Sequence, residues 1–171
     1  DSVVTSLEDQ IGPVRRGDEL DWVALERHLR EVVDDLPDSP MVVQQFTGGH
    51  ANLTYQLTFG QRRLVFRRPP RGVIAPGAHD MAREHRVLSR LWRSYPRAPR
   101  SFVFCDDDSI VGAPFVILEH RDGVVVRQDI PPSMAHHHDV ARRVNLALID
   151  ATADLHAIDV EAAELGDLGR P

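Results

Sequence analysis

Three short segments constrain the fold of this chain more than any other feature of its sequence. Residues 41–46 form a β-prone run, residues 53–59 alternate apolar and polar side chains, and residues 63–68 form a third run that ends at Pro69-Pro70. Alternation with a period of two is typical of a half-buried strand, and proline stops strand pairing. Because glycine-containing turns join the three runs, we expect an antiparallel meander.

Helical and strand patterns alternate around this meander. Apolar residues at helical spacing predict one helix after Asp18 or Asp21 and a second after Asp80. A third helix is predicted from Pro131 to Ile158. Residues 1–17 look like an arm. Further strands are expected at 101–105 and 114–119, with a short one at 124–127 and an acidic turn at 106–109. This order lacks βαβ regularity, so it predicts an α+β fold with an antiparallel sheet of about five strands.

Composition excludes several classes of protein. The chain has 171 residues, of which 42% are hydrophobic and 27% charged, which provides enough apolar material for a core. The net charge of -6 argues against a nucleic-acid binder, and no apolar run is long enough to cross a membrane. The single cysteine, Cys105, fits a reducing cytoplasm. All 20 basic residues are arginines, so any cationic site must use a guanidinium.

A glycine turn and a basic strand form the first candidate site. Gly48 and Gly49 lie between two predicted strands, where backbone N–H groups can approach an anion closely. Arg67, near the end of the following strand, is placed to reach the same anion. The alternatives are an ordinary hairpin turn and an arginine on a solvated sheet face.

A helix and a later strand add two further candidates. Glu84 lies on the apolar side of its helix, where a carboxylate needs a partner such as Arg67, unless it sits at the edge of the stripe and reaches water. Residues 114–118 form an apolar strand that runs into a polar turn at Gly123. That turn is either a hinge that offers backbone groups to a flat base or the exit of a central strand.

The order of these signals resembles a known family. The segments FTGGHANLTYQL, LVFRRPP, HDMAREHRVLSRL, GAPFVILEHRDG and ADLHAID…LGDLGRP, spread over about residues 41–171, are similar to the aminoglycoside phosphotransferase/choline kinase-like superfamily. They look closest to its kinase-like branch associated with acyl-CoA dehydrogenases. The resemblance implies a protein-kinase-like N-terminal lobe followed by the first helix or helices of a C-terminal lobe.

The resemblance also implies roles for particular residues. The nucleotide-positioning loop, which would lie over the ATP phosphates, would consist of Gly48, Gly49, His50, Ala51 and Asn52. Arg67 occupies the strand position where the family usually has an ATP-contacting lysine, and Glu84 matches the helix glutamate that pairs with that cation. Leu118 would be the gatekeeper, and Glu119 to Arg121 would form the hinge whose backbone reads adenine.

The implied division of the chain has three parts: an N-terminal arm and helix (1–40), a kinase-like N-lobe (41–123), and the hinge and start of a C-lobe (124–171). The implied activity is ATP-dependent transfer of a phosphoryl group to the hydroxyl of a small molecule, which the branch suggests is a hydroxylated acyl thioester. The family's catalytic Asp and Mg²⁺ ligands would lie downstream of this segment, which would be inactive alone. The alternatives are a pseudokinase that binds without chemistry and a structural fragment that no longer binds nucleotide.

Two expectations concern the C-terminal part. His136, His137 and His138 are successive residues at a helix start and point in different directions, so we expect no metal site there. The apolar stripe of the helix from Val140 to Ile158 would pack on C-lobe elements outside this segment. Without them it would be exposed, which favours either a longer chain, self-association through this helix, or its folding onto the sheet.

Overall fold

The computed structural model describes residues 11–47, 52–72, 79–123, 126 and 130–168. Its strands are β1 (Ile11–Gly12), β2 (Met41–Phe46), β3 (Leu53–Phe59), β4 (Arg62–Arg68), β5 (Ser101–Cys105) and β6 (Phe115–Glu119). Its helices are α1 (Trp22–Val32), α2 (Met81–Leu91), α3 (Asp108–Val111), α4 (Pro132–Ala135) and α5 (Val140–His156), followed by a 3₁₀ turn at Gly166–Leu168.

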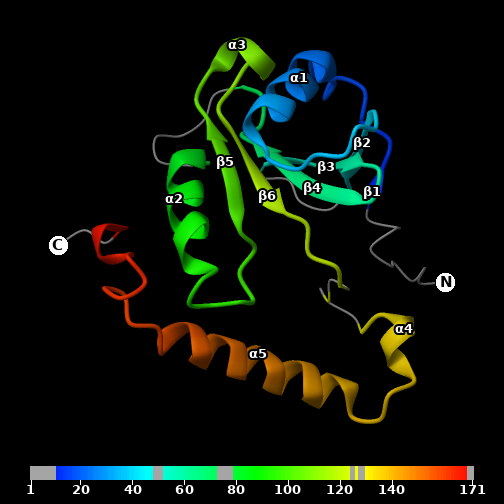
Figure 1. Ribbon diagram of the computed structural model, residues 1–171. Helices are drawn as coiled ribbons and strands as arrows, with labels where there is room; N and C mark the ends of the chain where they lie inside the picture. Colours follow the sequence, from blue (N-terminus) through cyan, green and yellow to red (C-terminus); the bar gives the residue numbers. More distant parts are fainter. Residues whose placement is uncertain (1–10, 48–51, 73–78, 124–125, 127–129, 169–171) are drawn as a thin grey trace.

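The strands form one antiparallel sheet in the order β1-β2-β3-β4-β6-β5 (Figure 1). The predicted meander is present as β2, β3 and β4. Strand β6 lies between β4 and β5, so the last two strands pair in reverse of their chain order. The sheet and helices together confirm the expected α+β class.

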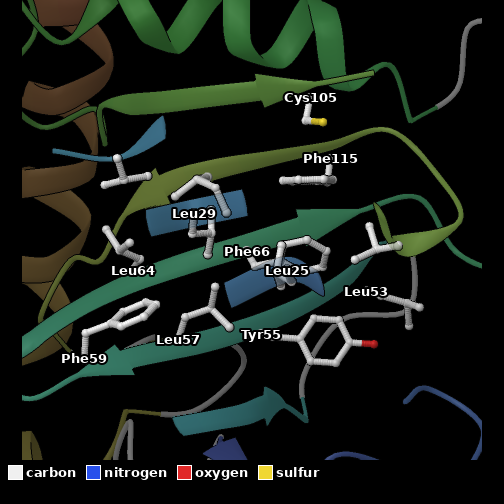
Figure 2. Packing of buried hydrophobic residues seen from close by; sticks show 13 residues of the cluster. Leu25, Leu29, Leu53, Tyr55, Leu57, Phe59, Leu64, Phe66, Cys105 and Phe115 are labelled. Atoms are coloured by element: carbon white, nitrogen blue, oxygen red, sulfur yellow. The ribbon is translucent and has the colours of Figure 1, made fainter. Parts of the chain in front are cut away.

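The two faces of the sheet bury different clusters. On one face, Leu25 and Leu29 of α1 pack against Phe66 and Phe115, whose ring centroids are 5.1 Å apart (Figure 2). Burying each such side chain contributes about 1.5–3 kcal/mol. Because side chains alternate along a strand, the residues next in sequence face the other way. Val116 and Leu118 of β6 therefore pack with Met81 of α2 on the opposite face.

Helix α2 begins where the sequence predicts. The side chain of Asp80 accepts a hydrogen bond of 2.9 Å from the backbone N–H of Arg83, which satisfies one of the free donors of the first turn. Farther along the helix, His85 Nδ1 lies 2.8 Å from Ser101 Oγ of β5. These contacts fix the start of α2 and its rotation against the sheet.

Three local predictions need correction. Part of the expected arm forms β1, which pairs with β2 and makes the sheet six-stranded rather than five-stranded. The acidic turn continues into a short helix, α3, because Asp107 caps it and Gly112 ends it with a φ of 80°. The single helix expected from Pro131 is two helices, α4 and α5, separated by a turn that includes Asp139 at a φ of 57°. Most of the strand expected at 124–127 lies outside the described residues.

Helix α5 extends away from the sheet (Figure 1) and buries none of its residues. Leu148 and Leu155, two residues of the predicted apolar stripe, are 65% and 40% exposed, so the stripe is open in this chain. The helix is attached by two polar contacts: Tyr95 Oη donates to the Ala151 carbonyl at 2.9 Å, and Arg97 pairs with Asp154. Within the described residues, no helix is both long enough and apolar enough to span a membrane.

Candidate functional site

A cavity of about 550 Å³ opens where the end of β4 meets the start of α2. Its lining brings together residues from three separate segments: the position just before β3, the strand β4, and the entry and first two turns of α2. These residues are Asn52, Arg67, His79, Asp80, Met81, Arg83, Glu84, Val87 and Leu88. The cavity therefore contains three of the residues that the sequence analysis singled out.

Arg67 and Glu84 form an ion pair in this cavity. Arg67 points to the α2 face because it stands between Phe66 and Arg68, which are buried on the α1 side. Its Nη1 donates to Glu84 Oε1 at 3.1 Å, and the two side chains are 37% and 19% exposed. The pairing expected from the sequence is present, and the alternative of a water-facing Glu84 at the stripe edge is excluded.

Partial burial of the pair perturbs the glutamate. Desolvation raises the pKa of Glu84 above its ordinary value, and the charge and hydrogen bond of Arg67 offset this only in part. Burial therefore disfavours the ionised carboxylate, and the guanidinium of Arg67 is the group that opposes this effect. The charge of the carboxylate, in turn, orients a cation that faces an open cavity.

A second contact connects the same two parts of the structure. The Oδ1 atom of Asn52 lies 2.5 Å from Nδ1 of His79, the residue immediately before the helix cap Asp80. Sequence reasoning placed Asn52 in the site but missed His79. Its position directly before a predicted helix cap was a signal for the helix start and carried no information about its partner.

The gatekeeper candidate Leu118 is buried on the same sheet face. It is 5% exposed, stands opposite Val65 of β4, and packs with Met81. Leu118 thus belongs to the apolar layer between the sheet and α2, next to the residues that line the cavity.

The side chains of the hinge candidates lie elsewhere. Glu119 and Arg121 line a second cavity, of about 590 Å³, beside Trp92 and Arg100. Arg121 Nη2 donates to the carbonyls of Pro96 and Ala98 at 2.9 and 2.8 Å and pairs with Glu119 at 3.0 Å. Their side chains therefore fasten the hinge to the segment before β5, which leaves the predicted role to their backbone.

Two groups of candidates remain: the residues of the glycine turn and possible metal ligands. Gly48, Gly49, His50 and Ala51 fall outside the described residues. Among the residues that are described, no three His, Cys, Asp or Glu side chains are grouped to hold a metal ion. The magnesium ligands expected downstream therefore stay a prediction.

Two longer proteins are similar to this chain in sequence. Mouse acyl-CoA dehydrogenase family member 10 is 29% identical over 158 residues, which is 92% of this chain and 15% of that protein. Chicken acyl-CoA dehydrogenase family member 11 is 30% identical over 169 residues, or 96% of this chain and 21% of that protein. The chain thus spans about a fifth or less of the length of these relatives.

The fold also matches a solved structure. A crystal structure from Ralstonia eutropha, classed as an aminoglycoside phosphotransferase, superimposes with a TM-score of 0.68 at 28% identity and covers 90% of this chain and 43% of that one. The fold is therefore kinase-like. The model of the phosphotransferase enzyme family matches residues 42–171. By this match and by the fold, the chain is a member of the phosphotransferase enzyme family.

Proposed function

We propose that this chain is the nucleotide-binding N-terminal portion of an ATP-dependent small-molecule phosphotransferase. The observation that carries the proposal is the Arg67–Glu84 ion pair, with Nη1 and Oε1 3.1 Å apart, on the wall of a cavity of about 550 Å³. A cation at the end of a strand, held by a carboxylate and open to a cavity, suits the phosphates of a nucleotide.

The donor set fits that ligand. A guanidinium carries five N–H donors, so Arg67 can hold Glu84 and still bridge phosphate oxygens. Its fork is bulkier than the lysine usual at this position, and it never loses its charge. Asn52 adds an amide to the same wall, and Val87 and Leu88 of α2 add apolar lining against which a base can pack.

In this function the residues of the chain bind and orient. Glu84 fixes the guanidinium of Arg67, Arg67 holds the phosphates, and the hinge backbone at Glu119 to Arg121 positions the base. Magnesium-ATP supplies the γ-phosphoryl group and the metal charge that neutralises it. Such positioning and charge stabilisation provide most of the rate in phosphoryl transfer.

We propose a hydroxylated acyl thioester as the acceptor. The relatives are named as members of the acyl-CoA dehydrogenase family, and an acyl-CoA is an acyl thioester. The chain matches these relatives over 92–96% of its length. Transfer would form a bond between the acceptor hydroxyl oxygen and the γ-phosphorus, break the bond to ADP, and release the hydroxyl proton.

We also propose that the protein is cytoplasmic, because its single cysteine, Cys105, fits a reducing compartment.

The test uses the complete polypeptide that carries this chain. It is incubated with Mg-ATP and a panel of hydroxyacyl-CoA thioesters, with the matching unhydroxylated thioesters and an aminoglycoside as controls. Formation of a phosphoester signal by ³¹P NMR, together with ADP release, only with the hydroxyacyl substrates supports the proposal. Nucleotide binding without transfer to any hydroxyl would support the pseudokinase alternative instead.

A further inference from the structure

Two contacts attach the start of α2 to the sheet beside the cavity. One is the Arg67–Glu84 ion pair, and the other is the contact between Asn52 and His79. Glu84 lies in the first turn of α2, and His79 stands just before the helix cap. The second contact joins the residue that directly precedes β3 to the entry of the helix, and the proposed roles of Arg67 and Glu84 give it no function.

The chemistry of the contact fixes where its proton lies. The Oδ1 atom of an asparagine only accepts hydrogen bonds, so Nδ1 of His79 must be the donor. The bond also fixes the direction of the Asn52 amide, because its oxygen is turned toward the helix entry.

The backbone of His79 is also unusual. Its φ is 57°, a left-handed conformation that costs free energy for most L-residues and that asparagine, aspartate and histidine adopt more readily. The next residue, Asp80, already caps α2. His79 therefore immediately precedes a helix cap while its ring contacts Asn52, and both His79 and Asn52 line the cavity with Arg67.

We infer that His79 is a positioning residue for the nucleotide. Its ring holds Asn52, and with it the entry of β3, against the start of α2, so that Asn52 and Arg67 meet the phosphates in one fixed arrangement. This inference rests on the proposed function, because it assigns the cavity to nucleotide phosphates. The effect passes through Asn52 rather than through a contact of His79 with the ligand.

Three substitutions separate the ring from the backbone. His79→Ala removes the ring, His79→Gly removes it and also relieves the left-handed conformation, and His79→Asn keeps both an N–H donor near the Nδ1 position and a tolerance for that conformation. The complete polypeptide is titrated calorimetrically with the non-hydrolysable analogue AMP-PNP and Mg²⁺. We expect His79→Ala and His79→Gly to raise its Kd by about fivefold to tenfold, and His79→Asn to stay within about twofold.

A double-mutant cycle tests the route through Asn52. Asn52→Ala should raise the Kd by a similar factor, and adding His79→Ala should raise it little further, because both substitutions break the same bond. The exposed histidine variant His137→Ala is the matched control and should bind AMP-PNP as the wild type does. Once an acceptor is known, His79→Ala should raise the KM for ATP more than it lowers kcat.

The outcomes are distinct. A wild-type Kd in His79→Gly would show that only the backbone matters and would overturn the inference while leaving nucleotide binding intact. Fully additive effects of His79→Ala and Asn52→Ala would overturn it as well. A wild-type protein that does not bind AMP-PNP would overturn both this inference and the proposed function.

Discussion

Arg67 on β4 and Glu84 on α2 are 17 positions apart in the sequence, yet Nη1 of one lies 3.1 Å from Oε1 of the other. The pair joins the sheet to the helix at the wall of a cavity. Because the guanidinium is partly exposed and the carboxylate mostly buried, the pair holds a cation toward the cavity rather than neutralising a core.

Replacing Arg67 removes the cation that we assign to the phosphates. In the complete enzyme we expect Arg67→Ala to lower kcat/KM at least about tenfold, or roughly 1.4 kcal/mol of transition-state binding, with a smaller loss in Arg67→Lys. Steady-state kinetics with varied ATP measures the effect. Arg62→Ala, on the same strand, is the control. Unchanged kinetics in Arg67→Ala would mean that another group holds the phosphates.

Glu84 should make nucleotide binding sensitive to acid. Because burial raises its pKa, the wild type should lose AMP-PNP affinity as the pH falls, starting above the ordinary glutamate pKa of about 4.3. Protonation removes the charge that orients Arg67. Glu84→Gln should bind weakly throughout and lack this step. If Glu84→Gln loses AMP-PNP affinity with falling pH to the same extent as the wild type, the loss is due to another group.

Although Glu84→Gln should weaken nucleotide binding, it should not lower the stability of the fold near neutral pH. A carboxyl whose folded pKa is raised stabilises the fold most at low pH and loses that contribution as the pH rises through the folded pKa. Above that pKa the buried charge is a cost, so Glu84→Gln should unfold at the same or a higher Tm near pH 7.5. Differential scanning calorimetry of wild type and variant at pH 7.5 checks this. A Tm clearly below that of the wild type would contradict it.

Two histidines whose side chains are partly or almost fully buried, His85 and His120, should make the stability of the fold sensitive to acid. Burial lowers the pKa of His85, and burial together with Arg63 lowers that of His120, so the unfolded state binds protons first. The free energy of unfolding should therefore fall as the pH drops below about 6.5. Urea denaturation at pH 7.5 and 5.5 measures this. The slope should be smaller in His85→Asn and His120→Asn and unchanged in the exposed-site control His138→Asn.

Arg121 should contribute to stability through the segment before β5. Its guanidinium donates to the carbonyls of Pro96 and Ala98, so Arg121→Ala should lower the free energy of unfolding by about 1–2 kcal/mol. Arg86→Ala, an exposed arginine on α2, is the control. Equal urea midpoints for the two variants would show that the hydrogen bonds of Arg121 stabilise the fold no more than hydrogen bonds to water would.

The open face of α5 should drive self-association of this chain in isolation. Leu148 and Ile149 are more than half exposed, and contiguous apolar surface of this kind is uncommon on monomers. Sedimentation velocity should show dimers or larger species that Leu148→Glu together with Ile149→Glu converts to monomers. Arg143→Glu, which changes charge on the same helix without removing apolar surface, should not. A monomeric wild-type chain would contradict the prediction.

The sequence predicted the local elements well where one signal acts over a few residues. Strands β2, β3 and β5 have the predicted bounds, since alternation and flanking turns are encoded in the segments themselves. Asp21 and Asp80 cap α1 and α2 for the same reason. Strand β1 was missed because two residues carry no period, and their pairing with β2 depends on a partner more than 30 positions away.

The candidate site likewise contains some features that the sequence predicts and others that it does not. Arg67 and Glu84 could be paired from the sequence, because strand alternation and the helical stripe each give a direction and the family resemblance supplies the match. The contact of His79 with Asn52 and the second cavity beside Arg121 could not. Each depends on which segments distant in the chain pack together, and burial and hydrogen bonding across such distances are settled only when the sheet and helices close around one core.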